Sequence, residues 1–360
     1  EYEIIAKPPL AKNKKALVSY ANNSILATGD WYKIRIDKSG VYKLTYEELV
    51  QIGISNPATA SIYGNGGSML PLNFETSFPD DLQEIRVKMI TGDDGIFNAG
   101  DFILFYAEGP NIANYDTSLN LYKQNLHLYS DYNYYFITSS RNAGKQITTI
   151  SSTNETATQS FNYYDELHYH EIDDTNLIRS GRNWFGEQFI NGITHEFSFE
   201  IPNRITSAPI KINVITAARS ASNYPDNYFR FSLNEHTNII EMPIGGVDLD
   251  GYVFGKSLLR SIETNSSQKN ILITLAFDGG SSTSKGWLDY FTINTRNELV
   301  FSNQQLHFRV LQSAGTGNIS KFNITNSSSN LSVWDITNHN DTKEINYQLS
   351  GNIASFTIPT

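Results

Sequence analysis

Apolar and polar residues alternate along much of the chain, and this pattern predicts β-strands. Near the amino terminus, Tyr32, Ile34 and Ile36 alternate with charged residues, as in a strand with one buried face. A Ser-Gly turn at 39–40 leads into a second apolar run at 41–44. We therefore expect residues 31–44 to form a hairpin.

The segment 86–109 carries the clearest strand pair. Two apolar runs, 86–90 and 102–107, flank a loop rich in glycine, asparagine and aspartate, the residues that tolerate turn geometry. The second run is apolar on both faces, so other parts of the chain must cover both. It is predicted to be a central strand of a packed β domain.

One short helix is predicted within this first β-rich region. Thr45 is a suitable N-cap, and Glu48 lies three residues later, which completes a capping box. Gly53 is placed to end the helix.

The second half of the chain contains short apolar runs separated by turn residues. Before residue 300 these runs are 161–172, 181–189, 194–201, 210–217, 228–233, 257–262, 271–277 and 287–293. Their even spacing predicts an antiparallel two-sheet sandwich of jelly-roll type. Further short runs after residue 301 predict the start of another β module.

These patterns divide the chain into four parts. We expect an arm or edge strand at 1–30, a first β-rich domain with the short helix at 31–155, a jelly-roll-like sandwich at 156–300 and a β module at 301–360. The Ser-, Thr-, Asn- and Gly-rich stretch 139–160 is expected to hold a boundary. The predicted fold class is mostly β, with tandem antiparallel domains.

Composition supports this fold class and excludes some functions. Aromatic residues make up 12% of the chain and charged residues only 18%, which favours pleated, half-buried surfaces. The net charge of −10 is opposite to the basic field that nucleic acid binding needs, so no nucleic acid partner is expected.

The sequence contains no cysteine, which excludes disulfides, thiolate metal sites and a cysteine nucleophile within these residues. Its apolar runs are far shorter than the roughly 20 residues that span a bilayer, so no transmembrane segment is expected. The amino terminus lacks a basic region followed by an apolar one, so we expect any signal peptide to have been removed.

The acidic loop of the predicted hairpin offers candidate metal ligands. Asp93, Asp94, Asn98 and Asp101 supply oxygen atoms at close spacing, which suits Ca²⁺. The EF-hand spacing is not met, and turns capped by these side chains explain the same residues without an ion. We expect no cofactor, with Ca²⁺ as the alternative.

Two further clusters have both a structural and a functional interpretation. His168 and His170 lie two apart on a predicted strand and point the same way, but no third metal ligand is identifiable. An exposed polar strand face is the preferred interpretation. A serine triad is not expected, because the G-x-S-x-G elbow of serine hydrolases is absent from the sequence. A carboxylate pair for glycoside cleavage stays open, since its members can lie far apart in the chain, but no pattern indicates one, and no catalytic residue is predicted.

The second cluster consists of Arg182, Trp184, Phe185 and Glu187, flanked by glycines. It is a candidate sugar-stacking or docking surface, and burial of its aromatic rings between sheets is the alternative.

Seven stretches together resemble one family. They are GVYKL (40–44), IYGNGG (62–67), GDFILFYAEGP (100–110), YSDYNYYF (129–136), GRNWFGE (181–187), GWLDYFTI (286–293) and VWDIT (333–337). Their joint order is similar to the amino-terminal region of the PorU family, the type IX secretion system sortases of Bacteroidetes, which are relatives of the gingipain cysteine peptidases.

The resemblance implies an exported protein at the cell surface, associated with the outer membrane. Members of this family remove the carboxy-terminal sorting domain of secreted cargo proteins and attach the cargo to anionic lipopolysaccharide, together with the outer-membrane barrel PorV. Their catalytic His and Cys belong to a peptidase domain that follows the β modules. No catalytic residue is carried over, so the implied role is a non-catalytic scaffold or docking surface, with a carbohydrate-binding sandwich as the alternative.

Overall fold

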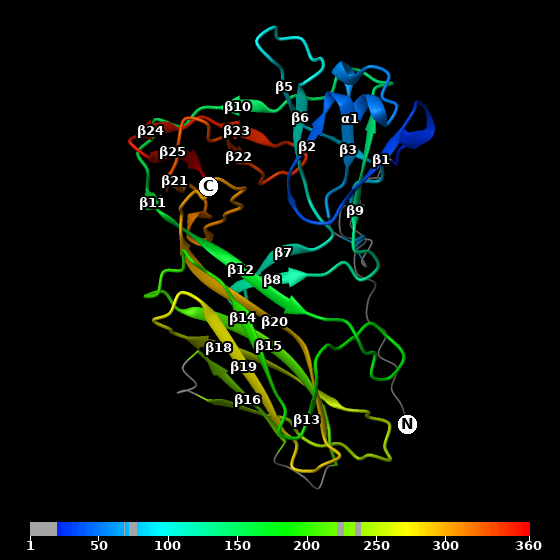
Figure 1. The fold of residues 1–360 in the computed structure, drawn as a ribbon, viewed down its shortest axis with the longest axis vertical. Coiled ribbons are helices and arrows are strands. Elements are labelled where there is room, and N and C mark those ends of the chain that lie inside the picture. Colours follow the sequence, from blue (N-terminus) through cyan, green and yellow to red (C-terminus); the bar gives the residue numbers. More distant parts are fainter. Residues whose placement is uncertain (1–19, 68, 72–77, 222–226, 235–238) are drawn as a thin grey trace, which may run out of the picture.

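The structure is a computed structural model that describes residues 20–67, 69–71, 78–221, 227–234 and 239–360. Residues 1–19 of the predicted amino-terminal arm lie outside the described residues. Figure 1 shows a β-rich molecule in which the strands form separate groups. The predicted fold class of tandem, mostly antiparallel β units with a short helix is confirmed.

The amino-terminal sheets lie at the upper right of Figure 1. One has the order β1-β9-β3-β4 and the other the order β2-β6-β5. The elements of this part are η1 (Ile25–Ala27), β1 (Tyr32–Ile36), β2 (Gly40–Thr45), α1 (Tyr46–Gln51), η2 (Pro57–Thr59), β3 (Ser61–Gly64), β4 (Gln83–Ile85), β5 (Val87–Ile90), β6 (Phe102–Ala107) and β9 (Asn133–Thr138). A separate hairpin, β7 (Ile112–Asp116) with β8 (Leu121–Asn125), extends toward the middle of the molecule.

Local sequence signals in these sheets are confirmed, but one predicted pairing is wrong. Strand β6 lies between β2 and β5, as expected of a strand that is apolar on both faces. In the capping box, Glu48 donates its N–H to Thr45 Oγ1 at 3.2 Å and accepts from Thr45 N–H at 2.8 Å. The predicted hairpin 31–44 does not form, because β1 pairs with β9 and β2 pairs with β6.

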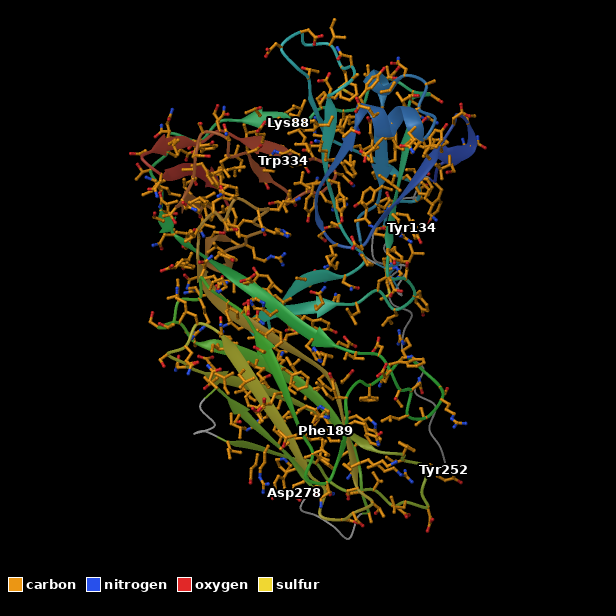
Figure 2. The ribbon with its side chains drawn as sticks, viewed as in Figure 1. Lys88, Tyr134, Phe189, Tyr252, Asp278 and Trp334 are labelled. Carbon is orange, nitrogen blue, oxygen red and sulfur yellow. The ribbon has the colours of Figure 1, made fainter. Side chains whose placement is uncertain are left out.

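The sandwich fills the lower half of Figure 1, and Phe189 and Asp278 mark it in Figure 2. A sheet of order β12-β20-β15-β18, with β13 also paired to β20, faces a sheet of order β14-β19-β16-β17. Its strands are β12 (Tyr163–Glu171), β13 (Gln188–Ile190), β14 (Thr194–Phe199), β15 (Ile210–Arg219), β16 (Tyr228–Leu233), β17 (Ile240–Pro243), β18 (Lys256–Thr264), β19 (Ile271–Asp278) and β20 (Lys285–Glu298). Buried aromatic rings such as Phe189, Phe229 and Phe291 fill the space between the sheets.

The carboxy-terminal sheets lie at the upper left of Figure 1 and have the orders β10-β23-β22 and β11-β21-β25-β24. Their elements are β10 (Thr148–Ile150), β11 (Gln159–Phe161), η3 (Leu311–Ser313), β21 (Ile319–Ile324), β22 (Val333–Asp335), β23 (Lys343–Ile345), β24 (Gln348–Ser350) and β25 (Ile353–Pro359). Their core contains Phe161, Phe322 and Phe356, with Phe322 stacked on Phe356 at a centroid distance of 5.3 Å.

Two strands of the carboxy-terminal sheets come from the polar stretch before the sandwich. β10 pairs in parallel with β23, and β11 pairs in parallel with β21. The chain therefore contributes to these sheets before it enters the sandwich and again after it leaves. The division of the chain at residues 31, 156 and 301 stays a prediction.

Candidate functional site

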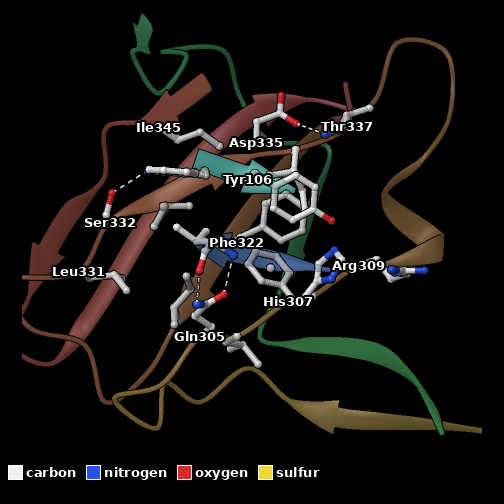
Figure 3. A pocket seen from close by; sticks show the side chains of 18 of the residues that line it. Tyr106, Gln305, His307, Arg309, Phe322, Leu331, Ser332, Asp335, Thr337 and Ile345 are labelled. Carbon is white, nitrogen blue, oxygen red and sulfur yellow. Dashed lines mark hydrogen bonds between the residues drawn. The ribbon is translucent and has the colours of Figure 1, made fainter. Parts of the chain in front are cut away.

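A pocket of about 830 Å³ lies where the amino-terminal sheets meet the carboxy-terminal sheets. We call it the junction pocket. Its walls come from β2 and β6 on one side, from β21, β22 and β25 on the other, and from the segment 305–310 between them. Figure 3 shows the side chains of Tyr106, His307 and Phe322 gathered around it.

The side chain of Gln305 connects the two sides of the junction pocket. Its Oε1 accepts a hydrogen bond from Val41 N–H at 2.8 Å, and its Nε2 donates to the carbonyl oxygen of Val41 at 2.6 Å. A primary amide thus binds the edge of β2 in the way that the backbone of a neighbouring strand would.

Aromatic groups in the junction pocket are uncharged at neutral pH. Desolvation by the protein groups packed around its ring, together with the charge of Arg309, lowers the pKa of His307 to about 4. Burial, together with the charge of Glu108, raises the pKa of Tyr106 to about 12. The two rings contact edge to face at a centroid distance of 6.1 Å, so this part of the wall is aromatic and neutral.

Ion pairs join the same two groups of sheets beside the pocket. Lys88 on β5 binds both carboxylate oxygens of Glu344 on β23, at 2.6 and 2.7 Å. Arg86 pairs with Asp341, and this contact holds the pKa of Asp341 below its usual range. These pairs are partly buried, so they fix the relative position of the sheets better than exposed pairs do.

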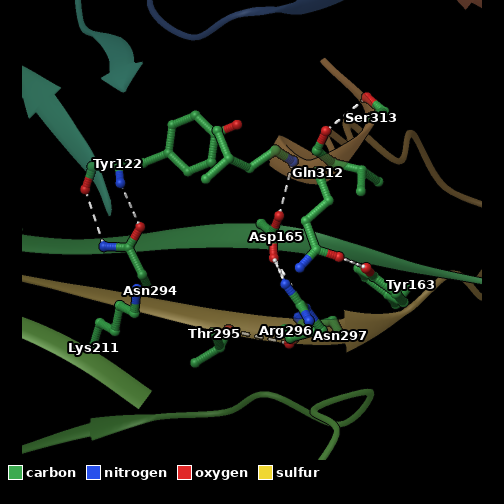
Figure 4. Close-up of polar contacts among 12 residues, drawn as sticks. Tyr122, Tyr163, Asp165, Lys211, Asn294, Thr295, Arg296, Asn297, Gln312 and Ser313 are labelled. Atoms are coloured by element: carbon green, nitrogen blue, oxygen red, sulfur yellow. Dashed lines mark hydrogen bonds and ion pairs between the residues drawn. The ribbon is translucent and has the colours of Figure 1, made fainter. Parts of the chain in front are cut away.

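A second amide joins the β7–β8 hairpin to the sandwich (Figure 4). Tyr122 donates its N–H to Asn294 Oδ1 at 2.7 Å, and Asn294 Nδ2 donates to the carbonyl oxygen of Tyr122 at 3.0 Å. Close by, Asp165 accepts from Arg296 at 3.2 Å and from the backbone N–H of Leu311 at 2.9 Å. The sandwich therefore holds both the hairpin and the start of the carboxy-terminal sheets.

We expect Asn294→Ala to release the β7–β8 hairpin from the sandwich. Loss of the paired hydrogen bonds, at about 1 kcal/mol each, raises the local opening rate of the hairpin. Hydrogen–deuterium exchange across residues 121–125 is then expected to speed up by about tenfold or more. Asn191→Ala is the matched control, because its amide accepts from Gly279 N–H within the sandwich and does not contact the hairpin; equal exchange in the two variants would contradict the expectation.

The acidic loop 93–101 is organised by hydrogen bonds within the chain. Asp101 accepts from the N–H groups of Gly92 and Asn98 at 2.9 and 2.7 Å. Asp94 accepts from Ile96 N–H at 3.0 Å and from Asn98 Nδ2 at 2.9 Å, and these contacts lower the pKa of Asp94. Across the described residues, no three His, Asp or Glu side chains come together as a metal site. Binding of Ca²⁺ by this loop stays a prediction.

The predicted cluster around Trp184 splits into exposed and buried parts. Phe185 is buried against Ala217 and Trp287, whereas Arg182 and Trp184 are exposed, with 43% of Trp184 accessible. Glu187 is half-buried and lies 2.7 Å from His170 Nε2, a contact that lowers the pKa of Glu187 against the opposing effect of burial. Only Arg182 and Trp184 remain available to a ligand, and that role stays a prediction.

His168 and His170 do point the same way on β12, but not outward. Both rings contact aromatic residues of the sandwich, His168 with Phe199 and His170 with Phe197 and Phe291. The expected exposed strand face is therefore wrong for these two side chains. They lie half-buried at the margin of the core because β12 turns this face toward β14.

Neither a protein-family model nor a curated protein matches the sequence. Among solved structures, dimeric latent PorU from Porphyromonas gingivalis matches with a TM-score of 0.81 and 25% identity over 94% of this chain. The chain is a PorU-like region. This PorU-like region covers 31% of the PorU chain in that structure.

Carbohydrate-binding modules also match, at much lower similarity. The CBM36-1 domain of a xylanase from the hindgut metagenome of Trinervitermes trinervoides has a TM-score of 0.23, with 10% identity over 36% of this chain and 95% of its own. A family 35 module from Clostridium thermocellum has a TM-score of 0.22, with 15% identity over 35% of this chain and 90% of its own. Scores this low carry no argument about the PorU-like region.

Proposed function

We propose that this chain is the non-catalytic, β-rich amino-terminal region of a type IX secretion sortase, and that it acts as a scaffold or docking surface. The similarity to PorU over 94% of the chain supports this proposal. The chain contains no cysteine, so a cysteine nucleophile must come from another part of such a protein. In this view the parent protein removes sorting domains of cargo and attaches the cargo to anionic lipopolysaccharide at the cell surface.

The junctions between the sheets support a rigid scaffold. The amide of Gln305, the amide of Asn294 and the Lys88–Glu344 ion pair hold three groups of sheets together. A docking surface assembled in advance loses less entropy on binding than one that must be ordered by its partner. No helix of the described residues is long and apolar enough to cross a membrane. Association with the outer membrane is proposed to involve the barrel PorV, the partner that the sequence resemblance implies.

A binding experiment with separate components tests this role. The purified chain is immobilised and offered the PorV barrel, a cargo protein with its sorting domain, and the peptidase portion of the parent protein. We expect retention of at least one of them. Trp184→Ala and Tyr252→Ala, which alter exposed aromatic residues of the sandwich, locate the contact face. If none of the three components is retained, the proposal is overturned.

Carbohydrate binding is a second candidate, favoured by the exposed ring of Trp184 beside Arg182. An indole face stacks on a pyranose ring, and the guanidinium adds affinity for an anionic sugar. Calorimetry with an anionic polysaccharide, with and without Ca²⁺, is expected to detect heat of binding. Trp184→Ala is expected to lower the affinity at least tenfold, which is about 1.4 kcal/mol of binding free energy. Absence of heat under both conditions removes this candidate, and an effect of Ca²⁺ that Asp94→Asn abolishes assigns the ion to the acidic loop.

A further inference from the structure

The edge of β2 in the junction pocket has backbone groups that β6 does not use. In an antiparallel pair, successive residues direct their N–H and C=O groups alternately toward the partner strand and away from it. Val41 directs both groups away from β6, because both bind Gln305. Lys43, two residues later in the same strand, must therefore direct its own N–H and C=O to the same open edge.

No strand among the described residues pairs with this edge. The sheet ends at β2 in the order β2-β6-β5, and Lys43 is exposed. Farther along, the N–H of Thr45 binds Glu48 in the capping box, which closes the edge at the helix. The open part of the edge therefore consists of Val41, held by a side-chain amide, and Lys43.

Gln305 indicates the chemistry that this edge accepts. A primary amide carries one N–H donor and one C=O acceptor on adjacent atoms, as a peptide group does. Gln305 is an exposed residue in a segment without regular structure, so a peptide group can displace its side-chain amide at a modest cost in free energy. The pocket beside it is lined by apolar side chains, among them Leu306, Phe308 and Val333, which can accept side chains of an added strand.

We propose that the free edge of β2 binds an extended segment of a partner protein, which displaces the Gln305 side chain and pairs with Val41 and Lys43 as an added strand. Apolar side chains at alternate positions of the segment enter the junction pocket. This inference rests on the proposed docking role, for which it names the partner chemistry. Exposed strand edges of this kind are usually protected, and Gln305 provides that protection in the unbound protein.

The test uses a random twelve-residue peptide library displayed on phage and selected against the whole chain. We expect the selected peptides to alternate apolar and polar residues. Their affinities are then measured by fluorescence anisotropy on four proteins: the unmodified chain, Lys43→Pro, Lys43→Ala and Gln305→Ala. Lys43→Pro removes an outward N–H without removing a β2–β6 hydrogen bond, since proline is tolerated at such edge positions.

We expect Lys43→Pro to weaken binding at least tenfold, Lys43→Ala to change it less than twofold, and Gln305→Ala to strengthen it several-fold. Circular dichroism checks that Lys43→Pro is folded. A peptide that is N-methylated at alternate amides provides an independent arm on the unmodified chain and is expected to lose binding. Three results overturn the inference: no peptides are selected, Lys43→Pro binds as tightly as Lys43→Ala, or the methylated peptide binds normally.

The experiments distinguish failure of the docking role from failure of strand addition at β2. If the chain retains PorV, cargo or the peptidase portion but binds no peptide at β2, the scaffold role stands without strand addition. If peptides bind at β2 and none of those proteins is retained, the sortase assignment fails while the peptide site remains.

Discussion

Replacing Arg204 by alanine is expected to destabilise the sandwich by about 3 kcal/mol. Arg204 is 2% exposed and lies where the chain passes the end of β20. Its Nε donates to the carbonyl oxygens of Gln268 and Lys269 at 3.1 and 3.2 Å, and its Nη2 donates to that of Ser266 at 2.5 Å. These carbonyls belong to the loop that joins β18 in one sheet to β19 in the other.

The expected loss of stability is large because the guanidinium supplies the hydrogen bonds that these loop carbonyls would otherwise lack. A loop that crosses between sheets has carbonyl groups with no strand partner, and burial makes each unsatisfied group costly. Burial also lowers the pKa of Arg204, although an arginine keeps its proton at any ordinary pH. The side chain therefore acts as a fixed cluster of donors that closes the end of the sandwich.

Urea unfolding, combined with hydrogen–deuterium exchange in β18 and β19, measures this effect within the sandwich. Arg204→Lys keeps the charge but offers fewer fixed donors, so its loss is expected to be intermediate. Arg230→Ala is the control, because the Arg230 side chain on β16 is 41% accessible and its ion pairs with Glu241 and Asp278 contribute little. A loss below about 1 kcal/mol for Arg204→Ala would show that water replaces the guanidinium.

Strands and helix caps could be predicted because their signals are local. The alternation at Tyr32–Ile36 predicted β1, and the spacing of Thr45 and Glu48 predicted the start of α1. The apolar run of β6 also predicted its central position. In each case a few neighbouring residues determine the outcome.

Pairings could not be predicted in the same way. β1 does not form a hairpin with β2 but pairs with β9, about a hundred residues later. In this arrangement Ile36 of β1 joins a buried cluster with Ile103 of β6 and Ile137 of β9. The polar stretch before the sandwich showed little periodicity, yet β10 and β11 within it pair with β23 and β21. Strand choice here depends on the packing of the whole chain and not on local pattern.

The side chains that build the junctions were also missed. Gln305 and Asn294 are single amides in polar or mixed surroundings, and nothing in the sequence separates them from ordinary surface residues. The acidic loop and the cluster around Trp184 were predicted as sites because each contains several charged or aromatic residues close together in the sequence. The acidic loop, however, mostly satisfies its own backbone, whereas the isolated amides connect distant parts of the chain.

The sandwich is expected to lose stability as the pH rises from about 4.5 to about 8. Glu171 at the end of β12 has a pKa raised from 4.5 to about 8, chiefly by burial and then by the nearby charges of Asp173 and Asp289. Burial and Asp173 likewise raise the pKa of Asp289 to about 6. A β-bulge in β20 leaves Asp289 without a partner on β15, next to Tyr290, which pairs with Glu171.

The direction of the stability change follows from the number of protons bound by the folded and the unfolded protein. An unfolded glutamate loses its proton near pH 4.5, whereas Glu171 in the folded protein keeps it until about pH 8. Between these values the folded state binds more protons than the unfolded state, so stability falls with rising pH and levels off above the folded pKa. Allowing for solvent screening, the loss across this range is about 2 kcal/mol.

Urea unfolding at pH 5 and pH 8 measures this loss, and Glu171→Gln is expected to remove most of the difference because glutamine does not titrate. Glu196→Gln, on the exposed face of β14, is the matched control and should keep the full pH dependence. Asp289→Asn should reduce the slope mainly below pH 6, since the pKa of Asp289 is about 6. If Glu171→Gln retains the slope of the unmodified chain, the burial of carboxylates at the bulge is not the cause.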